Sequence, residues 1–259
     1  DHGTVHTYGG RSEVVSLSMY DHPVFEPKKQ GRLTILICTP DQHTPRFQSC
    51  LDSVYRTTRG IPCSVMVLDN RGDPEFRHAS EINRALMMAN GPLITLDDDV
   101  TVVGDWLPAM LEAATENVAI VALSVWRNPS HLWSRALSFD AKGRPINWKG
   151  EISQPTPVPA ACSCCWLIND PDMRMSLDYT KYYFDPDACF HAWHRGQRVI
   201  VLPQPVYHEG AGATRDSGGN VAALVDRDRA AFRRTWITSG WLADLRAQYG
   251  AIWPEDMRW

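Results

Sequence analysis

The first hundred residues alternate short apolar runs with segments of helical spacing, and this alternation limits the folds open to the chain. β-branched and apolar residues fill 33–38, 63–68 and 93–96, a composition typical of buried strands. Between them, 45–57 and 81–89 carry apolar side chains at helical spacing. Strands that alternate with helices predict an α/β fold, whose parallel sheet is built with right-handed crossovers.

Polar residues follow each of the three predicted strands. The clusters are Thr39–Asp41, Asp69–Asp73 and Asp97–Asp99. The carboxyl ends of parallel strands share one edge of a sheet, where open α/β sheets bind their ligands. Three consecutive carboxylates repel one another, whereas Mg²⁺ and Mn²⁺ favour carboxylate oxygens and also bind phosphates. We therefore expect a metal and nucleotide site at this edge, and a solvated acidic turn is the alternative interpretation.

The other elements are predicted from the same kinds of pattern. Asp105 is expected to cap a helix, and residues 127–157 are expected to form a loop. Residues 1–30 are interpreted as an extension with one short strand near 14–17. The remaining predictions are strands at 118–125, 162–168 and 199–202, helices at 186–195, 221–234 and 236–249, and a glycine-rich candidate lid at 210–219.

Composition excludes some functions and partners. The net charge of −4 lacks the basic footprint of nucleic-acid-binding proteins, so we expect no nucleic-acid partner. No run of about 18 apolar residues occurs, so we expect no transmembrane segment. The seven cysteines include an apolar group at Cys162–Cys165, which predicts buried thiols in a reducing cytosol. We expect a cytoplasmic protein and leave peripheral contact with a membrane open.

Four motifs occur in order along the chain. Thr39-Pro40 follows the first strand, and Asp69-Asn70 follows the second. Asn83 and Gly91 precede Leu96-Asp97-Asp98-Asp99, Phe184-Asp185-Pro186-Asp187 opens a helix, and Val206-Tyr207-His208-Glu209-Gly210 closes a strand. Over roughly 32–215 this series resembles the GT-A glycosyltransferases, especially the large inverting group called family 2.

The resemblance implies a fold and a division of the chain. It implies a Rossmann-like mixed, mostly parallel sheet flanked by helices, followed by a small helical C-terminal segment. Residues 1–30 would be an N-terminal extension and 31–215 the catalytic domain, followed by helices at 216–259. Within the catalytic domain, about 31–103 would bind the nucleotide sugar and about 104–215 the acceptor.

The resemblance also implies a role for individual residues. Asp69 would contact the base of a nucleotide sugar, in a pocket lined by Thr39 and Pro40. Asp99 and His208 would bind Mn²⁺ or Mg²⁺, and Asp185 would be the general base that takes the acceptor proton. Asp97 and Asp98 would lie near the ribose and the metal, and Arg215 would cover the diphosphate.

Different interpretations of these residues stay open. Asp185 could instead cap the helix that follows it, and Asp187 is a rival general base. His208 could be an ordinary hydrogen-bonded histidine, and Asn83 is better explained by a structural role. Trp133, Trp148 and Trp166 could stack on an acceptor sugar, although large aromatic residues usually belong to the core, and His191 and His194 are better explained as a solvated or packed pair.

The sequence departs from the family pattern at two places. Ile82 occupies the position before the asparagine where the family often has a basic residue, so Arg71, Arg77 or Arg84 would have to replace it. Phe184 stands where the family has the first acid of its Glu-Asp-x-Asp motif. The assignment of the general base therefore depends on Asp185.

The function implied is metal-dependent transfer of a sugar, with inversion, from a UDP, GDP or dTDP-type donor to a hydroxyl of a glycan or small molecule. A nucleotidyltransferase is an alternative, but it would need a glycine-rich basic loop after the first strand. Residues 39–44 contain neither Gly nor Lys. A non-catalytic module that binds nucleotide sugars and a retaining GT-A enzyme also stay open.

Overall fold

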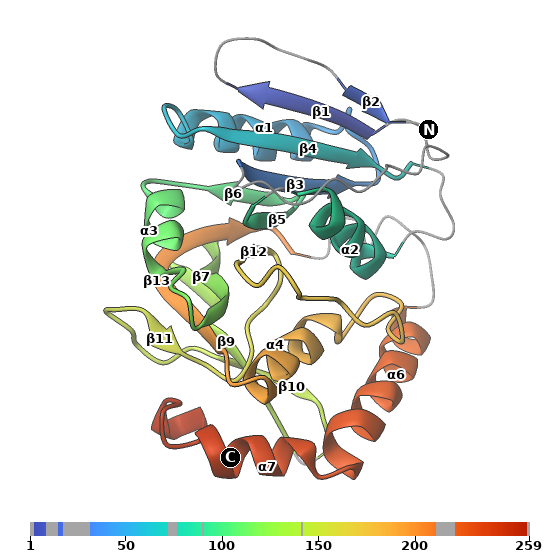
Figure 1. The fold of residues 1–259 in the computed structure, drawn as a ribbon, viewed down its shortest axis with the longest axis vertical. Coiled ribbons are helices and arrows are strands. Elements are labelled where there is room, and N and C mark those ends of the chain that lie inside the picture. The colour runs from blue at the N-terminus through green and yellow to red at the C-terminus, as the bar shows by residue number, and fades with distance from the viewer. Residues whose placement is uncertain are drawn as a thin grey trace.

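A computed structural model describes residues 3–8, 15–17, 32–71, 77–89, 91–140, 142–210 and 221–257. It confirms the α/β class, with a mixed and largely parallel central sheet flanked by helices (Figure 1). The apolar runs of the first hundred residues form β3 (Leu33–Thr39), β4 (Cys63–Asp69) and β5 (Leu93–Asp97). These three strands are parallel, with β3 between the other two, as their alternation with helices predicts.

The two expected crossover helices are present beside these strands. Helix α1 (Pro45–Thr57) has the predicted bounds, and the Thr44 hydroxyl accepts a hydrogen bond from the Phe47 N–H to cap it. Helix α2 (His78–Met88) begins three residues earlier than predicted. The next helix, α3 (Trp106–Ala113), follows Asp105 as expected, but the Asp105 side chain makes no capping hydrogen bond.

The second half of the sheet contains one reversed strand. β12 (Cys165–Ile168) is antiparallel to both of its neighbours, β5 and β7 (Val118–Asn128). Beyond them β13 (Arg198–His208) is parallel to β7, and β6 (Val100–Val102) is antiparallel to the end of β13. Because β6 begins directly after Asp99, this pairing brings the Asp97–Asp99 turn to His208.

The structure extends the expected N-terminal strand into a pair. β1 (Gly3–Tyr8) is antiparallel to β4, and β2 (Val15–Leu17), close to the predicted strand at 14–17, is antiparallel to β1. Both strands continue the main sheet at the edge next to β4.

The prediction of a loop at 127–157 is wrong. This region forms β8 (His131–Ser134), β9 (Ala136–Phe139), β10 (Pro145–Trp148) and β11 (Thr156–Pro157). These strands have two to four residues, and three of the four residues of β10 are exposed. Strands this short, with Pro and Gly nearby, lack the sustained alternation that identifies a strand in a sequence.

Two further boundaries differ from the predictions. β13 continues past Pro203 and Pro205, which lie where its register to β7 shifts between Leu202 and Pro205. Proline is tolerated at such an irregularity because the ladder is interrupted there. Helix α4 (Phe184–His194) begins two residues before the predicted start, so Asp185 lies in its first turn.

The C-terminal helices pack around α4. They are α6 (Val221–Phe232), a π-helical segment η1 (Arg233–Thr238), α7 (Trp241–Tyr249) and the short 3-10 helix η2 (Glu255–Met257). Figure 1 shows α6 and α7 beside α4, at the end of the molecule away from β1. Phe232 and Trp236 are fully buried and join the core on this side of the sheet. Among the described residues, no helix is long and apolar enough to cross a membrane.

Asn83 ties α2 to the segment that follows β12, in line with the structural role expected for it. Its amide nitrogen donates to the Met175 carbonyl at 2.8 Å, and its oxygen accepts from the Met175 N–H at 2.7 Å. The side chain therefore pairs with a buried piece of main chain as a neighbouring strand would.

We predict that Asn83→Ala lowers the free energy of unfolding by about 1–3 kcal/mol, because both main-chain groups of Met175 lose their partner. Urea unfolding would measure the change. Arg84→Ala on the same helix removes only a contact to Glu81 at 3.6 Å and should change stability by less than about 0.5 kcal/mol. Equal losses in the two variants would contradict the prediction.

Candidate active site

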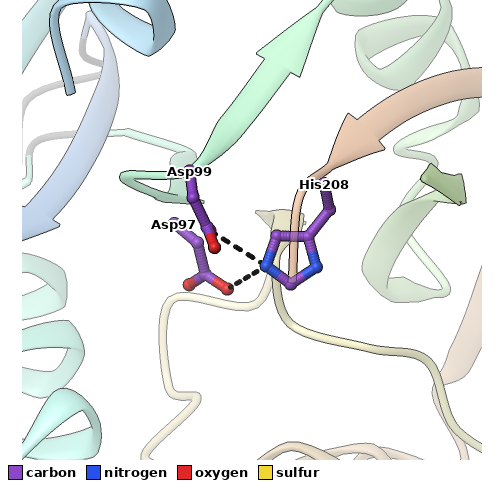
Figure 2. Close-up of side chains that lie close together, drawn as sticks. All are labelled: Asp97, Asp99 and His208. Atoms are coloured by element: carbon purple, nitrogen blue, oxygen red, sulfur yellow. Dashed lines mark ion pairs between the residues drawn. The ribbon is translucent and has the colours of Figure 1, made fainter. Parts of the chain in front are cut away.

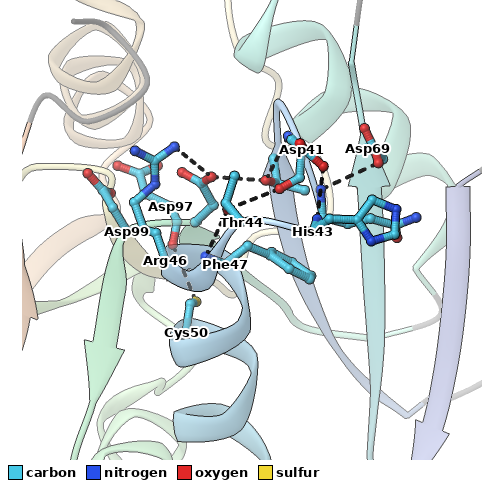
Figure 3. Close-up of polar contacts among 12 residues, drawn as sticks. Asp41, His43, Thr44, Arg46, Phe47, Cys50, Asp69, Asp97 and Asp99 are labelled. Atoms are coloured by element: carbon cyan, nitrogen blue, oxygen red, sulfur yellow. Dashed lines mark hydrogen bonds and ion pairs between the residues drawn. The ribbon is translucent and has the colours of Figure 1, made fainter. Parts of the chain in front are cut away.

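The polar clusters after β3, β4 and β5 meet at one edge of the sheet, as predicted. The Thr39 hydroxyl donates to Asp98 Oδ2 at 2.9 Å, which joins the ends of β3 and β5. The Gln42 N–H lies 3.4 Å from Asp69 Oδ2, which joins the loop after β3 to the end of β4. In Figure 3, Arg46 of α1 lies beside Asp97 and Asp99, and Asp69 lies at the end of the neighbouring β4.

The three consecutive aspartates do not share one environment. Asp98 is buried, and its Oδ2 accepts from the Thr39 hydroxyl and lies 3.3 Å from the Arg46 guanidinium. Burial raises the pKa of Asp98, although Thr39 and Arg46 oppose the rise. Asp98 thus anchors the turn to β3 and α1, and a contact of Asp98 with ribose stays a prediction.

Asp97 and Asp99 turn instead toward His208. The His208 Nε2 atom is 2.9 Å from Asp99 Oδ1 and 3.7 Å from Asp97 Oδ2 (Figure 2). One ligand atom from each of the three side chains lies within 4.8 Å of the others. Asp99 and His208 are only 8% and 7% exposed, whereas the Asp97 side chain is half-buried, so the group is accessible from the Asp97 side.

This group has the composition of a site for a divalent cation. Burial alone would lower the pKa of His208, but the hydrogen bond to Asp99 and the charges of Asp97 and Asp99 raise it to about 9. Protonated His208 therefore balances the charge of the two carboxylates, as a bound cation would. The two carboxylates suit Mg²⁺ and Mn²⁺, and the imidazole is a ligand that transition metals favour. The residues fit the expected metal, and Asp97 joins the expected pair of Asp99 and His208 as a third candidate ligand.

An aromatic ring packs on the metal-site histidine. Trp133 of β8 stacks on His208, with ring centroids 5.1 Å apart and planes 25° from parallel. The Arg127 guanidinium carbon lies 5.3 Å from the centroid of the Trp133 ring. Trp148 and Trp166 are buried, in agreement with the core interpretation of those two residues.

Asp69 is the last residue of β4, on the far side of β3 from Asp97. Burial opposes ionisation of its carboxyl, but hydrogen bonds from the Arg71 side chain and from the Arg71 and Gln42 N–H groups lower the pKa of Asp69. The Arg71 guanidinium is 2.6 Å from Asp69 Oδ2. Pro40 is half-buried at the end of β3, next to Thr39. The contact of Asp69, Thr39 and Pro40 with a nucleotide base stays a prediction.

Asp185 lies in the first turn of α4, half-buried. Burial raises the pKa of Asp185 to about 7; its own N–H and that of Ser163 limit the rise, and the charge of Asp97 adds to it. The loop 162–164 links this carboxyl to Asp97, the last residue of β5, because the Cys164 carbonyl accepts from the Asp97 N–H at 3.1 Å. The pKa of Asp185 is suited to proton transfer near neutral pH.

Asp187, the rival general base, is buried and hydrogen-bonded to core side chains. Its Oδ1 accepts from the Tyr179 hydroxyl at 2.9 Å and from the Trp236 indole N–H at 2.7 Å. The residue is 1% exposed. His191 lies 3.6 Å from Asp187 Oδ2, and the exposed His194 stacks on Trp241, in agreement with the expectation of a solvated or packed pair.

Two basic residues near Asp97 were missed by the sequence analysis. His78 Nδ1 lies 3.9 Å from Asp97 Oδ1, at the first residue of α2, which the predicted helix omitted. Burial lowers the pKa of Lys181, and the charge of Asp97 limits the fall. Of the arginines proposed to replace a base at Ile82, Arg71 contacts Asp69 within the candidate site, whereas Arg77 contacts the Leu177 carbonyl and Arg84 contacts Glu81.

Two further predictions concern the glycine-rich segment and the cysteines. Arg215 and the candidate lid beyond Gly210 lie outside the described residues. All seven cysteines are free, and burial raises the pKa of Cys38, Cys165 and Cys189, which favours neutral thiols. The structural interpretation of the cysteine group agrees with this environment.

Comparison with known proteins supports the resemblance found in the motifs. Residues 63–174 match the family model described as Glycosyl transferase family 2. The match includes Asp69 and Asp97–Asp99 and ends before Asp185 and His208. A search of curated proteins gave no match.

Solved structures with a similar arrangement share little sequence with this chain. GalNAc-T7 with UDP, GalNAc and Mn²⁺ is 12% identical with a TM-score of 0.45, over 70% of this chain and 44% of that one. The mannosyltransferase PcManGT from Pyrobaculum calidifontis, in complex with GDP-Man and Mn²⁺, is 13% identical with a TM-score of 0.46, over 87% of this chain and 77% of that one. A197 from STIV is 14% identical with a TM-score of 0.46, over 68% and 85% of the two chains.

We predict that the three neighbouring aspartates differ in their effect on cation binding. Asp97→Asn and Asp99→Asn each remove a charged ligand and should weaken Mn²⁺ binding by at least about tenfold. Asp98→Asn should weaken it less, because the Asp98 carboxylate is held by Thr39 and Arg46. Calorimetric titration with Mn²⁺ and Mg²⁺ would measure the three affinities. An effect of Asp98→Asn as large as that of Asp97→Asn would contradict the assignment.

Proposed function

We propose that this family 2-like glycosyltransferase uses a divalent cation at Asp97, Asp99 and His208 to transfer a sugar from a nucleotide-diphosphate donor to an acceptor hydroxyl. Asp185 is the general base, and the anomeric centre is inverted. The donor is of the UDP, GDP or dTDP type, and the acceptor is a glycan or small molecule. The protein acts in the cytoplasm.

One observation carries this proposal. A candidate cation group and a carboxyl with a pKa of about 7 both contact the loop 162–164, so the two kinds of group that glycosyl transfer needs are adjacent. Cation binding alone would not require a carboxyl with a raised pKa beside it, and groups with perturbed pKa values are typical of active sites.

The chemistry assigns a separate task to each group. Asp185 accepts the proton of the acceptor hydroxyl while that oxygen forms a bond to the anomeric carbon. The bond from this carbon to the diphosphate oxygen breaks, and the diphosphate leaves with the electron pair. A bound divalent cation supplies electrostatic stabilisation of the leaving diphosphate. His78 and Lys181, both near Asp97, would add positive charge on the same side.

The alternative functions are weaker on specific grounds. A nucleotidyltransferase would need a glycine-rich basic loop after β3, whereas Asp41 and Thr44 form a tight turn that enters α1 directly. A module that only binds nucleotide sugars would have no use for Asp185 at a pKa of about 7. A retaining reaction is distinguished by the anomeric configuration of the product, which NMR of the first turnovers would measure.

We predict that Asp185→Asn lowers kcat by about 10²–10⁴-fold and leaves binding of the nucleoside diphosphate with Mn²⁺ unchanged. The amide keeps the shape of the side chain but cannot take a proton. Transfer would be measured with UDP, GDP and dTDP sugars against acceptor mixtures, and binding by calorimetry. Asp178→Asn, an exposed position in the same segment, is the matched control and should retain full kcat.

The same variant has a readout that needs no substrate. Because burial raises the pKa of Asp185 above its unfolded value, ionisation of this carboxyl destabilises the folded protein above pH 7. Asp185→Asn should therefore be more stable than the wild type above pH 7, with the difference lost as the pH falls toward 4. Full kcat in Asp185→Asn would show that another group is the base.

We predict that kcat/KM of the wild type falls as the pH drops below about 7, because protonated Asp185 cannot act as a base. A bound cation favours the carboxylate and would shift this limb to lower pH. The pH profile of initial rates, measured at saturating Mn²⁺, would test this. A profile that is flat between pH 5 and pH 8 would contradict a general-base role for Asp185.

A further inference from the structure

A buried carboxylate of the C-terminal segment holds the main chain that leads to Asp185. Asp228 of α6 is 0% exposed. Its Oδ2 accepts from the N–H groups of Thr180 at 3.1 Å, Lys181 at 2.9 Å and Tyr182 at 2.9 Å, and its Oδ1 accepts from Thr180 at 3.1 Å. Three consecutive N–H groups thus point at a single side chain that lies 46–48 residues further along the chain.

This arrangement restrains the segment strongly. A buried charge is costly unless hydrogen bonds replace its water, and N–H bonds to a carboxylate are roughly twice as strong as those between neutral groups. The Arg227 guanidinium, 3.6 Å from Asp228 Oδ1, adds an exposed counter-charge. If the segment 180–182 moved away, Asp228 would lose all of these main-chain donors at once.

The restrained segment ends at a strained residue. Tyr183 has φ of 67°, the only positive φ of a described residue other than glycine. Side chains other than glycine rarely adopt this conformation, and it persists only where the surroundings enforce it. The Tyr183 ring packs on Phe232 of α6, with centroids 5.1 Å apart. Asp185 follows two residues later, so the direction in which α4 starts depends on this turn.

A second contact holds the other side of Asp185. Asp187 accepts from the Tyr179 hydroxyl and from the indole N–H of Trp236 in the π-helical segment η1. The segment 179–187, which contains Asp185, is therefore tied to the C-terminal helices before and after this residue.

We infer that Asp228 is a positioning residue for Asp185, and that the segment 221–238 is thereby a working part of the active site although it contributes no group to the cation site. The inference depends on the proposed role of Asp185. Displacing a reacting group by about 1 Å can cost about 10²-fold in rate, so a restraint of this kind is visible in kcat.

The variant Asp228→Asn tests the inference. The amide keeps one acceptor oxygen and replaces the other with a group that cannot accept, so part of the array is lost at constant size. We expect kcat to fall by at least about tenfold, with the donor KM and the affinity for the nucleoside diphosphate unchanged. The acidic limb of the kcat/KM profile should also shift, because a displaced Asp185 leaves the Ser163 N–H and Asp97. Asp226→Asn, at an exposed site on the same helix, is the matched control and should behave as the wild type.

A measurement without turnover accompanies the kinetics. Hydrogen exchange of the amides at 180–182 should be faster in Asp228→Asn than in Asp226→Asn, because these amides lose their acceptor. If Asp228→Asn fails to fold, Trp236→Phe replaces it, since this change removes the indole N–H that binds Asp187 and keeps a smaller aromatic ring in the core. It should lower kcat in the same way, with unchanged donor affinity.

The outcomes separate the inference from the proposed function. Wild-type kcat, wild-type pH profile and unchanged exchange at 180–182 in Asp228→Asn would overturn the inference while the transferase assignment stood. Loss of kcat with intact donor binding and faster exchange would support it. Wild-type protein that transfers no sugar to any acceptor would overturn the proposed function, and the inferred role of Asp228 would fall with it, whatever the exchange data show.

Discussion

The contact between Asp99 and His208 is the interaction on which the candidate site depends. It joins the turn after β5 to the last residue of β13, two points more than a hundred residues apart in the sequence. The β6–β13 ladder places the two side chains, and each lowers the cost of burying the other because their charges are opposite. A divalent cation would replace the proton of His208 and hold the same three groups.

Local patterns predicted the parts of the fold that are locally determined. Long apolar runs identified β3, β4, β5 and β7, because strands that are buried on both faces of a sheet are apolar along their whole length. Apolar residues at helical spacing identified α1. The strands between 127 and 157 are too short to leave such a trace. The sequence also could not show which of three adjacent aspartates faces His208, because the turn after β5 decides this and its direction depends on Thr39 and Arg46.

The residues that the sequence analysis missed share a cause. Asp228 lies in a run of alternating Asp and Arg that is typical of a solvated helix face, yet it is fully buried because three N–H groups of a distant loop surround it. His78 and Lys181 likewise lie near a residue distant in the sequence, Asp97 of β5. Contacts with residues distant in the sequence decide whether a polar residue is buried or exposed, and a local sequence pattern does not reveal those contacts.

The reversed direction of β12 has a consequence for the separation between Asp97 and Asp185. Because β12 runs against β5 and β7, it starts at the edge where the parallel strands end, and its entry loop can touch Asp97 and Asp185 together. A strand parallel to β5 would start at the opposite edge and could not do so. The loop 162–164 thus sets the spacing between Asp185 and Asp97, and an insertion of even one residue there would change their separation without altering either residue.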